Sequence, residues 1–206
     1  TFHYASLYAP HIDIAAGPYF NLTLSGGSSY WLSGTTTVSG NLLIDDSTLS
    51  ADIYTLNVGG NWTNTGTFNA GSGTVVLNSA TQAQSVTSGG SAFNILTVTN
   101  TYTAGVSFVD RLVTAYLNAG SGVKKLSFSS ASQSQPHRVT TGFNVLGSAG
   151  NLIELAPIMA STTWYLEAPS TSTAYLKVGY SHLIGATITA TNSQDNSGNT
   201  NWNITP

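Results

Sequence analysis

The chain has 206 residues, and only 6% of them are Asp, Glu, Lys or Arg, against roughly 25% in ordinary soluble domains. The formal net charge is -3 and the few basic residues are scattered, which disfavours binding to a nucleic acid backbone. The absence of Cys excludes disulfides, thiol catalysis and Cys-ligated metals. No apolar stretch is long enough for a membrane helix, so we expect no membrane insertion.

Residues 1–19 stand apart at the start of the chain. Their sequence, TFHYASLYAPHIDIAAGPY, lacks the basic region and apolar core of a signal peptide, so we interpret the chain as the mature form, or a piece, of an exported protein. The segment is too apolar for a free tail, and we expect it to cap the first coil of the fold or to contact another copy. The candidate assembly contacts are Phe2, Tyr4, Leu7, Tyr8, Ile12 and Ile14, with Trp202 and Ile204 at the other end.

Short strands follow one another through residues 20–206, and helix signals are nearly absent. Each predicted strand is rich in β-branched or aromatic residues and is bounded by Gly, Asn, Ser or Asp, which favour turns. The predicted strands are 20–24, 37–44, 54–58, 73–78, 93–98, 125–128, 163–168, 174–178 and 186–191. The one modest helix candidate is 151–160, which Pro157 would break.

Two phrases of the sequence recur. FNAGSGTVVLNSATQAQ, at 68–84, resembles LNAGSGVKKLSFSSASQSQ, at 117–135, and Phe-Asn opens related segments at Phe20, Phe93 and Phe143. The offsets, about 49 and 73 residues, fit two and three turns of a unit of about 24 residues, which is a period typical of stacked repeats. We interpret NAGSG as a corner between strands, because Gly and Asn tolerate left-handed backbone angles.

Two segments resemble a known kind of repeat. GGNWTNTGTFNAGSGTVVLNSATQAQSV, at 59–86, and ATITATNSQDNSGNTNWNIT, at 186–205, are similar to the right-handed parallel β-helix repeats of large bacterial surface and extracellular proteins, of the filamentous-haemagglutinin and adhesin kind. In the second segment the matching residues are Asn192, Ser193, Asp195, Gly198, Asn199, Asn201 and Trp202. The resemblance covers residues 20–206 and implies a secreted, elongated module for adhesion, surface coating or fibre building, usually without catalysis. Residues 1–19 match no such repeat.

We therefore predict an all-β fold, a right-handed parallel β-helix (β-solenoid) of roughly eight coils, in which residues 20–206 form one solenoid domain. An antiparallel β-sandwich is the competing fold, because recurring short strands suit both architectures. The predicted interior consists of Leu22, Leu24, Val38, Leu42, Ile44, Leu56, Val58, Val75, Leu77, Val98, Leu126, Phe128, Leu155, Leu166, Leu176, Val178, Ile188 and Ile204.

A carbohydrate-active β-helix, either a polysaccharide lyase or a glycoside hydrolase, is the rival function. Its acids would be Asp45, Asp46, Asp52 or Asp110. Glycoside hydrolysis needs two carboxylates across the sugar, but Asp45 and Asp46 point to opposite faces of a strand unless they lie in a turn. We favour exposed corners for these carboxylates. The four histidines share no metal-like spacing, and no GxSxG elbow is present.

Two further patterns allow a ligand. Asp195, Ser197 and Asn199 alternate like the oxygen ligands of a calcium loop, but a single carboxylate favours an Asx-rich turn. Trp62 and Trp202 stand amid polar residues, which suits stacking on sugars, although positions in the core or at an end of the solenoid are favoured.

Surface features complete the expectations. Sequons at Asn21, Asn61 and Asn203 allow glycosylation in a suitable host. Ice binding is disfavoured because no Thr-x-Thr pattern recurs once per coil. We expect an extracellular, non-catalytic structural or adhesive protein with no cofactor and no metal. Its expected partners are copies of itself, arranged head to tail in a filament, and surface glycans.

Overall fold

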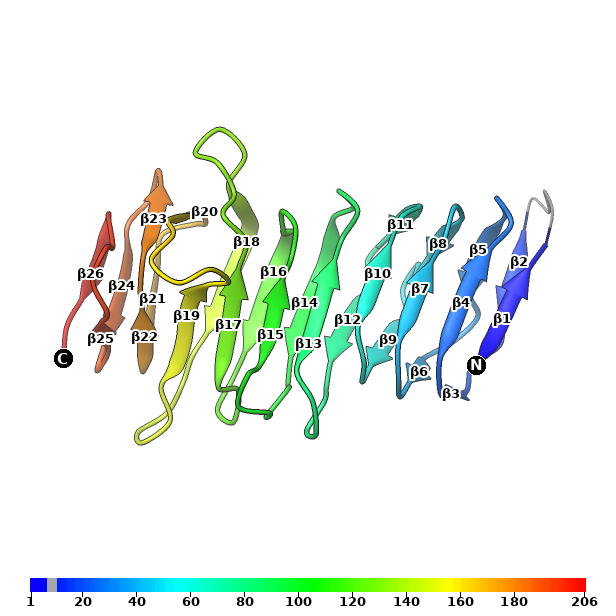
Figure 1. Cartoon of the computed structure of the whole chain (residues 1–206), viewed down its shortest axis with the longest axis horizontal. Coiled ribbons are helices and arrows are strands. Elements are labelled where there is room, and N and C mark those ends of the chain that lie inside the picture. Colours follow the sequence, from blue (N-terminus) through cyan, green and yellow to red (C-terminus); the bar gives the residue numbers. More distant parts are fainter. Residues whose placement is uncertain (7–10) are drawn as a thin grey trace.

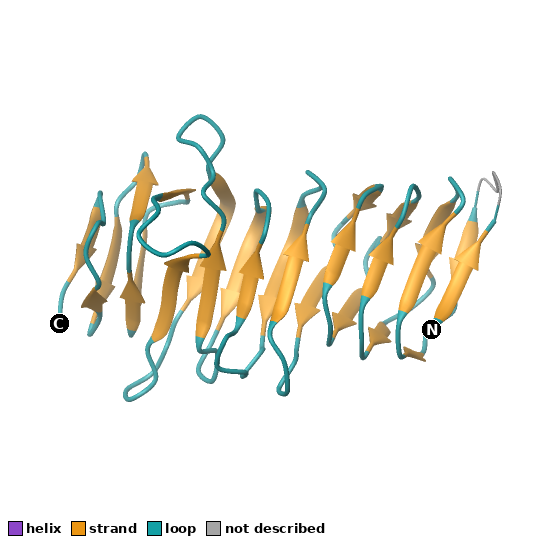
Figure 2. Cartoon of the chain, viewed as in Figure 1, coloured by secondary structure: helices purple, strands orange, loops and turns teal. Residues whose placement is uncertain are grey.

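The computed structural model is an elongated parallel β-solenoid of about 10 turns, with the two ends of the chain at opposite ends of the molecule (Figure 1). The structure describes residues 1–6 and 11–206. Within these residues the fold consists of strands joined by turns, without any helix (Figure 2). Every pairing between described strands is parallel, which confirms the solenoid and shows that the sandwich alternative is wrong. In this part of the chain no helix has the length and apolarity needed to cross a membrane.

One face, here called sheet A, contains a strand from each turn, 10 in the described part of the chain. Its strands are β1 (Phe2–Ala5), β4 (Leu22–Ser25), β7 (Leu42–Ile44), β10 (Trp62–Asn64), β13 (Gln84–Thr87), β15 (Val106–Phe108), β17 (Lys125–Phe128), β19 (Ile153–Pro157), β22 (Leu176–Val178) and β25 (Gln194–Asp195). The register is regular: Leu22 pairs with Leu42, and Leu42 pairs with Trp62.

The remaining faces are formed by three sheets. Sheet B contains β2 (Ile12–Ile14), β5 (Ser29–Leu32), β8 (Thr48–Ser50) and β11 (Thr67–Asn69). Sheet C contains β3 (Pro18–Tyr19), β6 (Thr36–Val38), β9 (Thr55–Val58), β12 (Thr74–Leu77), β14 (Phe93–Val98), β16 (Val113–Ala119), β18 (His137–Val145), β20 (Trp164–Glu167) and β23 (Ser181–Ile184). Sheet D contains β21 (Thr171–Ala174), β24 (Ile188–Thr191) and β26 (Trp202–Ile204).

The cross-section of the solenoid changes along its length. Early turns have one strand in each of sheets A, B and C, whereas the middle turns replace two short strands by the long strands β14, β16 and β18. Beyond β18 the long face divides again, because β18 pairs with β20 only through His137 and Arg138. The end of β18 approaches sheet D instead. Just after the strand, the Gly147 N–H donates to the Ala174 carbonyl at 3.1 Å. This division creates a groove, described below.

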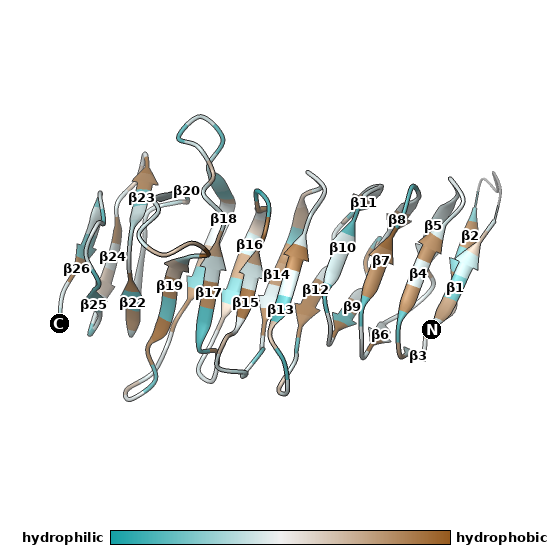
Figure 3. Ribbon diagram, in the orientation of Figure 1, coloured by the Kyte–Doolittle hydropathy of each residue, from teal (hydrophilic) through white to brown (hydrophobic). Residues whose placement is uncertain are grey.

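Alternating side chains build a single core inside the solenoid, visible as alternating bands along the strands (Figure 3). In β9, Leu56 and Val58 are buried while Thr55 and Asn57 face outward, as expected for a strand with one buried face. The predicted interior residues are all buried except Ile204, which is half-buried against the last turn. Each buried aliphatic side chain contributes about 1.5–3 kcal/mol, so the stacked turns supply most of the stability.

The two NAGSG phrases are corners, as predicted, but they are not equivalent corners. The first joins β11 of sheet B to β12 of sheet C, and the second joins β16 of sheet C to β17 of sheet A. Val75, just after the first phrase, pairs with Leu96 one turn later, and Leu96 pairs with Leu117 one turn after that. Leu117 comes just before the second phrase, so the two phrases occupy different positions in the coil. The offset between the two phrases is therefore not a whole number of turns, and dividing it into whole turns overestimated the number of residues per coil. Asn21 and Asn41, which occupy equivalent positions, are 20 residues apart. The shorter coil explains why about 10 turns fit where roughly eight were expected.

Three local predictions need correction. The predicted strand 174–178 spans a corner at Tyr175, where β21 ends and β22 follows. The predicted strand 37–44 is two strands, β6 and β7, separated by a corner at Gly40 and Asn41. The modest helix candidate 151–160 contains β19 instead, because its apolar residues continue the core of sheet A and Pro157 ends the strand.

Candidate functional site

Residues 1–19, apart from 7–10, form the first turn of the solenoid. β1 pairs with β4, β2 with β5 and β3 with β6, so this segment stacks on its own chain. Each of these three strands is the last of its sheet, and its outer edge has no partner strand in the described part of the chain. The first turn thus presents free backbone N–H and C=O groups, which favour pairing with a further strand.

A cluster of tyrosines closes the core at this end. The Tyr4 and Tyr19 hydroxyls lie 3.3 Å apart, and Tyr19 donates to the Ala15 carbonyl at 2.8 Å. The Tyr30 hydroxyl donates to the Ser25 carbonyl at 2.8 Å. Burial, together with the hydrogen bond to Tyr4, raises the pKa of Tyr19 to about 12. The Tyr19 hydroxyl therefore stays neutral at the end of the core.

The predicted assembly contacts at this end divide into exposed and buried side chains. Phe2 is 56% exposed, whereas Tyr4 and Ile12 are half-buried. Ile14 is fully buried in the core of its own chain, so it offers no surface to a partner. Leu7 and Tyr8 lie outside the described residues. The sequence prediction missed Phe20, which is 70% exposed at the corner between β3 and β4.

The opposite end has the same open character. β25 and β26 are the last strands of their sheets, and their outer edges have no partner strand among the described residues. The outer edge of β23 is covered by Thr200, which accepts the Leu183 N–H at 3.1 Å and donates to the Ser181 carbonyl at 2.9 Å. Trp202 and Ile204, the predicted contacts on β26, are half-buried. The Trp202 Nε1–H donates to the Ser181 hydroxyl at 3.0 Å, and its ring meets Phe143 edge-on at 6.4 Å. The indole thus covers the last turn of the core from the side.

The calcium-like sequence near this end is an Asx turn, the favoured interpretation. Asp195 Oδ1 accepts the backbone N–H of Ser197 at 2.8 Å and the side-chain amide of Asn199 at 2.7 Å. Ser197 and Gly198 have left-handed backbone angles, with φ of 64° and 71°. The carboxylate therefore holds the turn together. Among the described residues no group of three or more His, Cys, Asp or Glu could hold a metal ion.

The acidic cluster lies in corners of the solenoid. Asp45 and Asp46 are exposed between β7 and β8, and Asp46 has a left-handed φ of 48°. Asp52 is exposed between β8 and β9, with a φ of 54°. Asp45 Oδ1 accepts a hydrogen bond from the Thr65 hydroxyl of the next turn at 3.2 Å. These positions match the exposed corners that the sequence favoured.

Asp110 has a structural contact of a different kind. Its two carboxylate oxygens accept the backbone N–H groups of Ser88 and Gly89, each at 2.8 Å, and Oδ2 also accepts the Ser88 hydroxyl at 3.0 Å. Hydrogen bonds from backbone N–H groups to a carboxylate are strong and fix the turn that supplies the donors. Asp110 therefore locks one turn of the solenoid to the previous one.

Two of the four tryptophans belong to the core. Trp62 is buried, with its ring edge-on to Phe68 at 4.8 Å, which confirms the favoured position in the core and excludes the alternative of stacking on sugars. Trp164 is also buried and lies parallel to Phe128 at 4.2 Å. The polar neighbours Asn61 and Thr63 face outward and Asn64 is buried with Trp62, so the polar residues around the ring did not mark it as exposed.

His137 is a buried structural residue of the middle turns. Its Nδ1 accepts the Leu112 backbone N–H at 3.1 Å, and its Nε2–H donates to the Ser129 carbonyl at 2.9 Å. These two bonds require the neutral imidazole, since a protonated ring could not accept from Leu112. Burial lowers the pKa of His137. The ring therefore joins adjacent turns only while it is uncharged.

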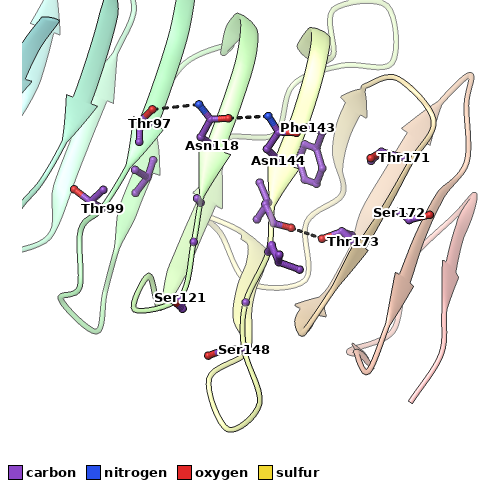
Figure 4. Close-up of a pocket in the computed structure, with 16 residues that line it drawn as sticks. Thr97, Thr99, Asn118, Ser121, Phe143, Asn144, Ser148, Thr171, Ser172 and Thr173 are labelled. Atoms are coloured by element: carbon purple, nitrogen blue, oxygen red, sulfur yellow. Dashed lines mark hydrogen bonds between the residues drawn. The ribbon is translucent and has the colours of Figure 1, made fainter.

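A groove of about 610 Å³ lies on the outer face of sheet C (Figure 4). It crosses the ends of β14, β16 and β18 and reaches β21, where the long face of the solenoid divides. Thr97, Asn118 and Asn144 lie in one row, because they pair in register on neighbouring strands. None of the residues lining this groove carries a charged side chain. Sequence patterns did not predict it, because its walls come from separate turns.

Comparisons with protein-family models, with curated proteins and with solved structures found no match to this chain.

Proposed function

We propose that this protein is a non-catalytic, extracellular structural or adhesive rod whose copies associate head to tail. The observation that carries the proposal is the pair of open ends: in the described part of the chain, β1, β2 and β3 leave unpaired edges at the first turn, and β25 and β26 leave unpaired edges at the last. All strands run the same way around the solenoid, so the end of one copy is suited to continue the sheets of the next. A contact of this head-to-tail kind does not close on itself and gives a filament.

The apolar surface at the first turn supports the same proposal. Phe2 and Phe20 are exposed there, next to the free edge of β1. Exposed aromatic side chains beside an unpaired edge would gain from burial against another strand. The sequence resemblance to adhesin repeats adds the expected extracellular setting, and the scarcity of charge agrees with it.

The non-catalytic part of the proposal is supported by the positions of the rival acids. Asp45, Asp46 and Asp52 lie in exposed corners, and the Asp110 carboxylate already accepts three hydrogen bonds. Neither arrangement gives two carboxylates facing each other across a cleft, as glycoside hydrolysis requires. Release of sugars from pectins, alginates or glycosaminoglycans, abolished by Asp46→Asn, would favour the carbohydrate-active alternative.

The free edge of β1 offers a specific test of association. The Phe2 N–H donates inward to the Asn21 carbonyl at 2.8 Å, so the alternate N–H groups of His3 and Ala5 point to the outer edge. Ala5→Pro removes one outward donor and places a proline ring at the edge, while it leaves the inward ladder intact. We expect analytical ultracentrifugation to show concentration-dependent association of the wild type and none of Ala5→Pro.

The control is a proline far from both ends. Gln133 is the second residue of a turn in which the Gln135 N–H donates to the Ser132 carbonyl at 3.0 Å, and proline suits this position. Gln133→Pro should associate like the wild type. Equal association of Ala5→Pro and wild type, or a wild type that stays monomeric at every concentration, would contradict head-to-tail contact through β1.

A further inference from the structure

The groove on sheet C presents polar side chains whose orientation is set by hydrogen bonds between turns. Asn144 Nδ2 donates to Asn118 Oδ1 at 2.9 Å, and Asn118 Nδ2 donates to the Thr97 hydroxyl at 3.2 Å (Figure 4). Because Asn144 acts as the donor at the end of this row of hydrogen bonds, its Oδ1 has no partner among the described residues. Asn144 lies close to the point where the long face of the solenoid divides. Each amide also keeps a second N–H, so the row offers both donors and acceptors.

An aromatic ring lies on the same face, next to this row. Tyr116 precedes Asn118 by two residues on β16, so both side chains point outward. Tyr116 pairs with Gly142 of β18, and a Cβ atom at Gly142 would lie 2.7 Å from Tyr116 Cδ1. Because glycine leaves this space free, the Tyr116 ring packs over the Gly142 backbone. The ring is 37% exposed, so part of it remains open to a ligand.

The opposite wall of the groove adds hydroxyl groups. Thr171 and Ser172 of β21 line it, and the wall closes where the Thr173 hydroxyl donates to the Val145 carbonyl. Phe143 and Val145, whose backbone forms the edge of β18 here, are buried. An added peptide strand would therefore not reach their N–H and C=O groups. The groove itself offers amides and hydroxyls without charge, and the Tyr116 ring lies beside it on the same face of the sheet.

We propose that this groove binds a neutral polysaccharide chain. An apolar face of one sugar ring would lie against Tyr116, and the sugar hydroxyls would bond the amides of Asn118 and Asn144. The groove spans three neighbouring strands, spaced about 4.8 Å apart, so it accommodates several sugar residues in a row. The absence of charged lining residues selects against acidic polysaccharides. The site lies on the side of the rod and does not depend on association of the ends.

Affinity electrophoresis of the full chain tests the proposal. Native gels would contain β-glucan, xylan, mannan or galactan as neutral probes, and polygalacturonate as the acidic probe. We expect at least one neutral polysaccharide to retard the protein. Tyr116→Ala and Asn144→Ala should each weaken that binding by about tenfold, the loss expected when an aromatic contact or a hydrogen bond is removed. Tyr116→Phe should bind like the wild type, because it keeps the ring.

Tyr102→Ala is the matched control, since Tyr102 is 39% exposed but lies in the loop between β14 and β15 rather than beside the row of amides on sheet C. It should bind like the wild type. The monomeric Ala5→Pro variant should also bind normally, so a failure of end-to-end association is distinguishable from a failure of this site. The proposal is overturned if no neutral polysaccharide retards the protein, if polygalacturonate binds more tightly, or if Tyr102→Ala weakens binding as much as Tyr116→Ala.

Discussion

Asn41 Oδ1 accepts the backbone N–H of Asn61 at 2.8 Å, and Asn21 Oδ1 accepts the N–H of Asn41 in the same way at 2.7 Å. These asparagines form a ladder at the corner between sheets C and A, one per turn. Asn41→Ala removes the acceptor of one rung and should cost about 1 kcal/mol of unfolding free energy. Asn41→Asp keeps the acceptor and should cost less. Urea denaturation measures the unfolding free energy of both variants. An equal loss in the two would show that the side-chain oxygen of Asn41 does not contribute to stability through this hydrogen bond.

Gly60 lies directly before this ladder and allows two turns to approach closely. A Cβ atom there would lie 2.4 Å from the Gly40 carbonyl carbon and 2.5 Å from Asn41 Oδ1. Gly60→Ala should therefore push the turns apart and destabilise the protein by about 1–3 kcal/mol. Gly120 is the matched control, because a Cβ there meets nothing within 4 Å and its backbone is not left-handed. Gly120→Ala should leave the melting temperature unchanged or slightly raised. Equal destabilisation by both changes would contradict the packing argument.

Two buried tryptophans allow a comparison of hydrogen bonding. Trp164 Nε1–H donates to the Gly179 carbonyl at 2.9 Å, whereas Trp62 Nε1 has no partner among the described residues. Replacement by Phe removes the same volume at both positions. Trp164→Phe should therefore cost about 1–3 kcal/mol more than Trp62→Phe, because it leaves the Gly179 carbonyl unpaired. Chemical denaturation of the two variants measures the difference. A larger loss of unfolding free energy in Trp62→Phe than in Trp164→Phe would contradict this comparison, because it would mean that the Trp62 indole N–H stabilises the fold without a hydrogen-bond partner.

The burial of His137 predicts a pH dependence of stability. Its folded-state pKa is lowered from the ordinary 6.5, chiefly by burial, although Asp110 opposes the shift and Arg111 adds to it. The unfolded chain therefore binds the proton more readily, and stability that is full above about pH 6.5 is lost as the pH falls. At pH 5.5 the loss from this residue is at most about 1.4 kcal/mol.

Thermal unfolding between pH 7.5 and 5.5 measures this effect. His137→Gln removes the titrating group, so its melting temperature should change less across this range than that of the wild type. His182→Gln, a substitution at a half-buried histidine on the outer face, should keep the wild-type slope. An unchanged slope in His137→Gln would assign the pH dependence to other residues.

The strands and the core could be predicted from the sequence because their signal is local. Alternation of apolar and polar residues marks the inward face of each short strand, and Leu56 and Val58 are buried as that pattern predicts. The length of the coil was also encoded, in the recurrence of Asn21, Asn41 and Asn61 before an apolar residue. The NAGSG repeat, which has a longer offset, predicted too long a coil, because its two copies form corners of different kinds that need the same residues.

The groove could not be predicted, because it depends on how distant turns align. Tyr116 and Gly142 become neighbours through a register shift after Thr114, where β18 has an extra residue. The division of the face beyond Arg138 likewise depends on which residues of β18 find a partner strand. Such register changes have no local signature in the sequence. Ile14 shows the same limit: its apolar character is evident, but only the stacked turns decide that it faces inward.

Electron microscopy of the purified full chain at high concentration tests the head-to-tail proposal most directly. If the open edges of β1 and of the last turn pair between copies, the wild type should form unbranched filaments one solenoid wide, and Ala5→Pro should form only short single rods. Wild-type protein that remains as single short rods at every concentration would contradict the proposal.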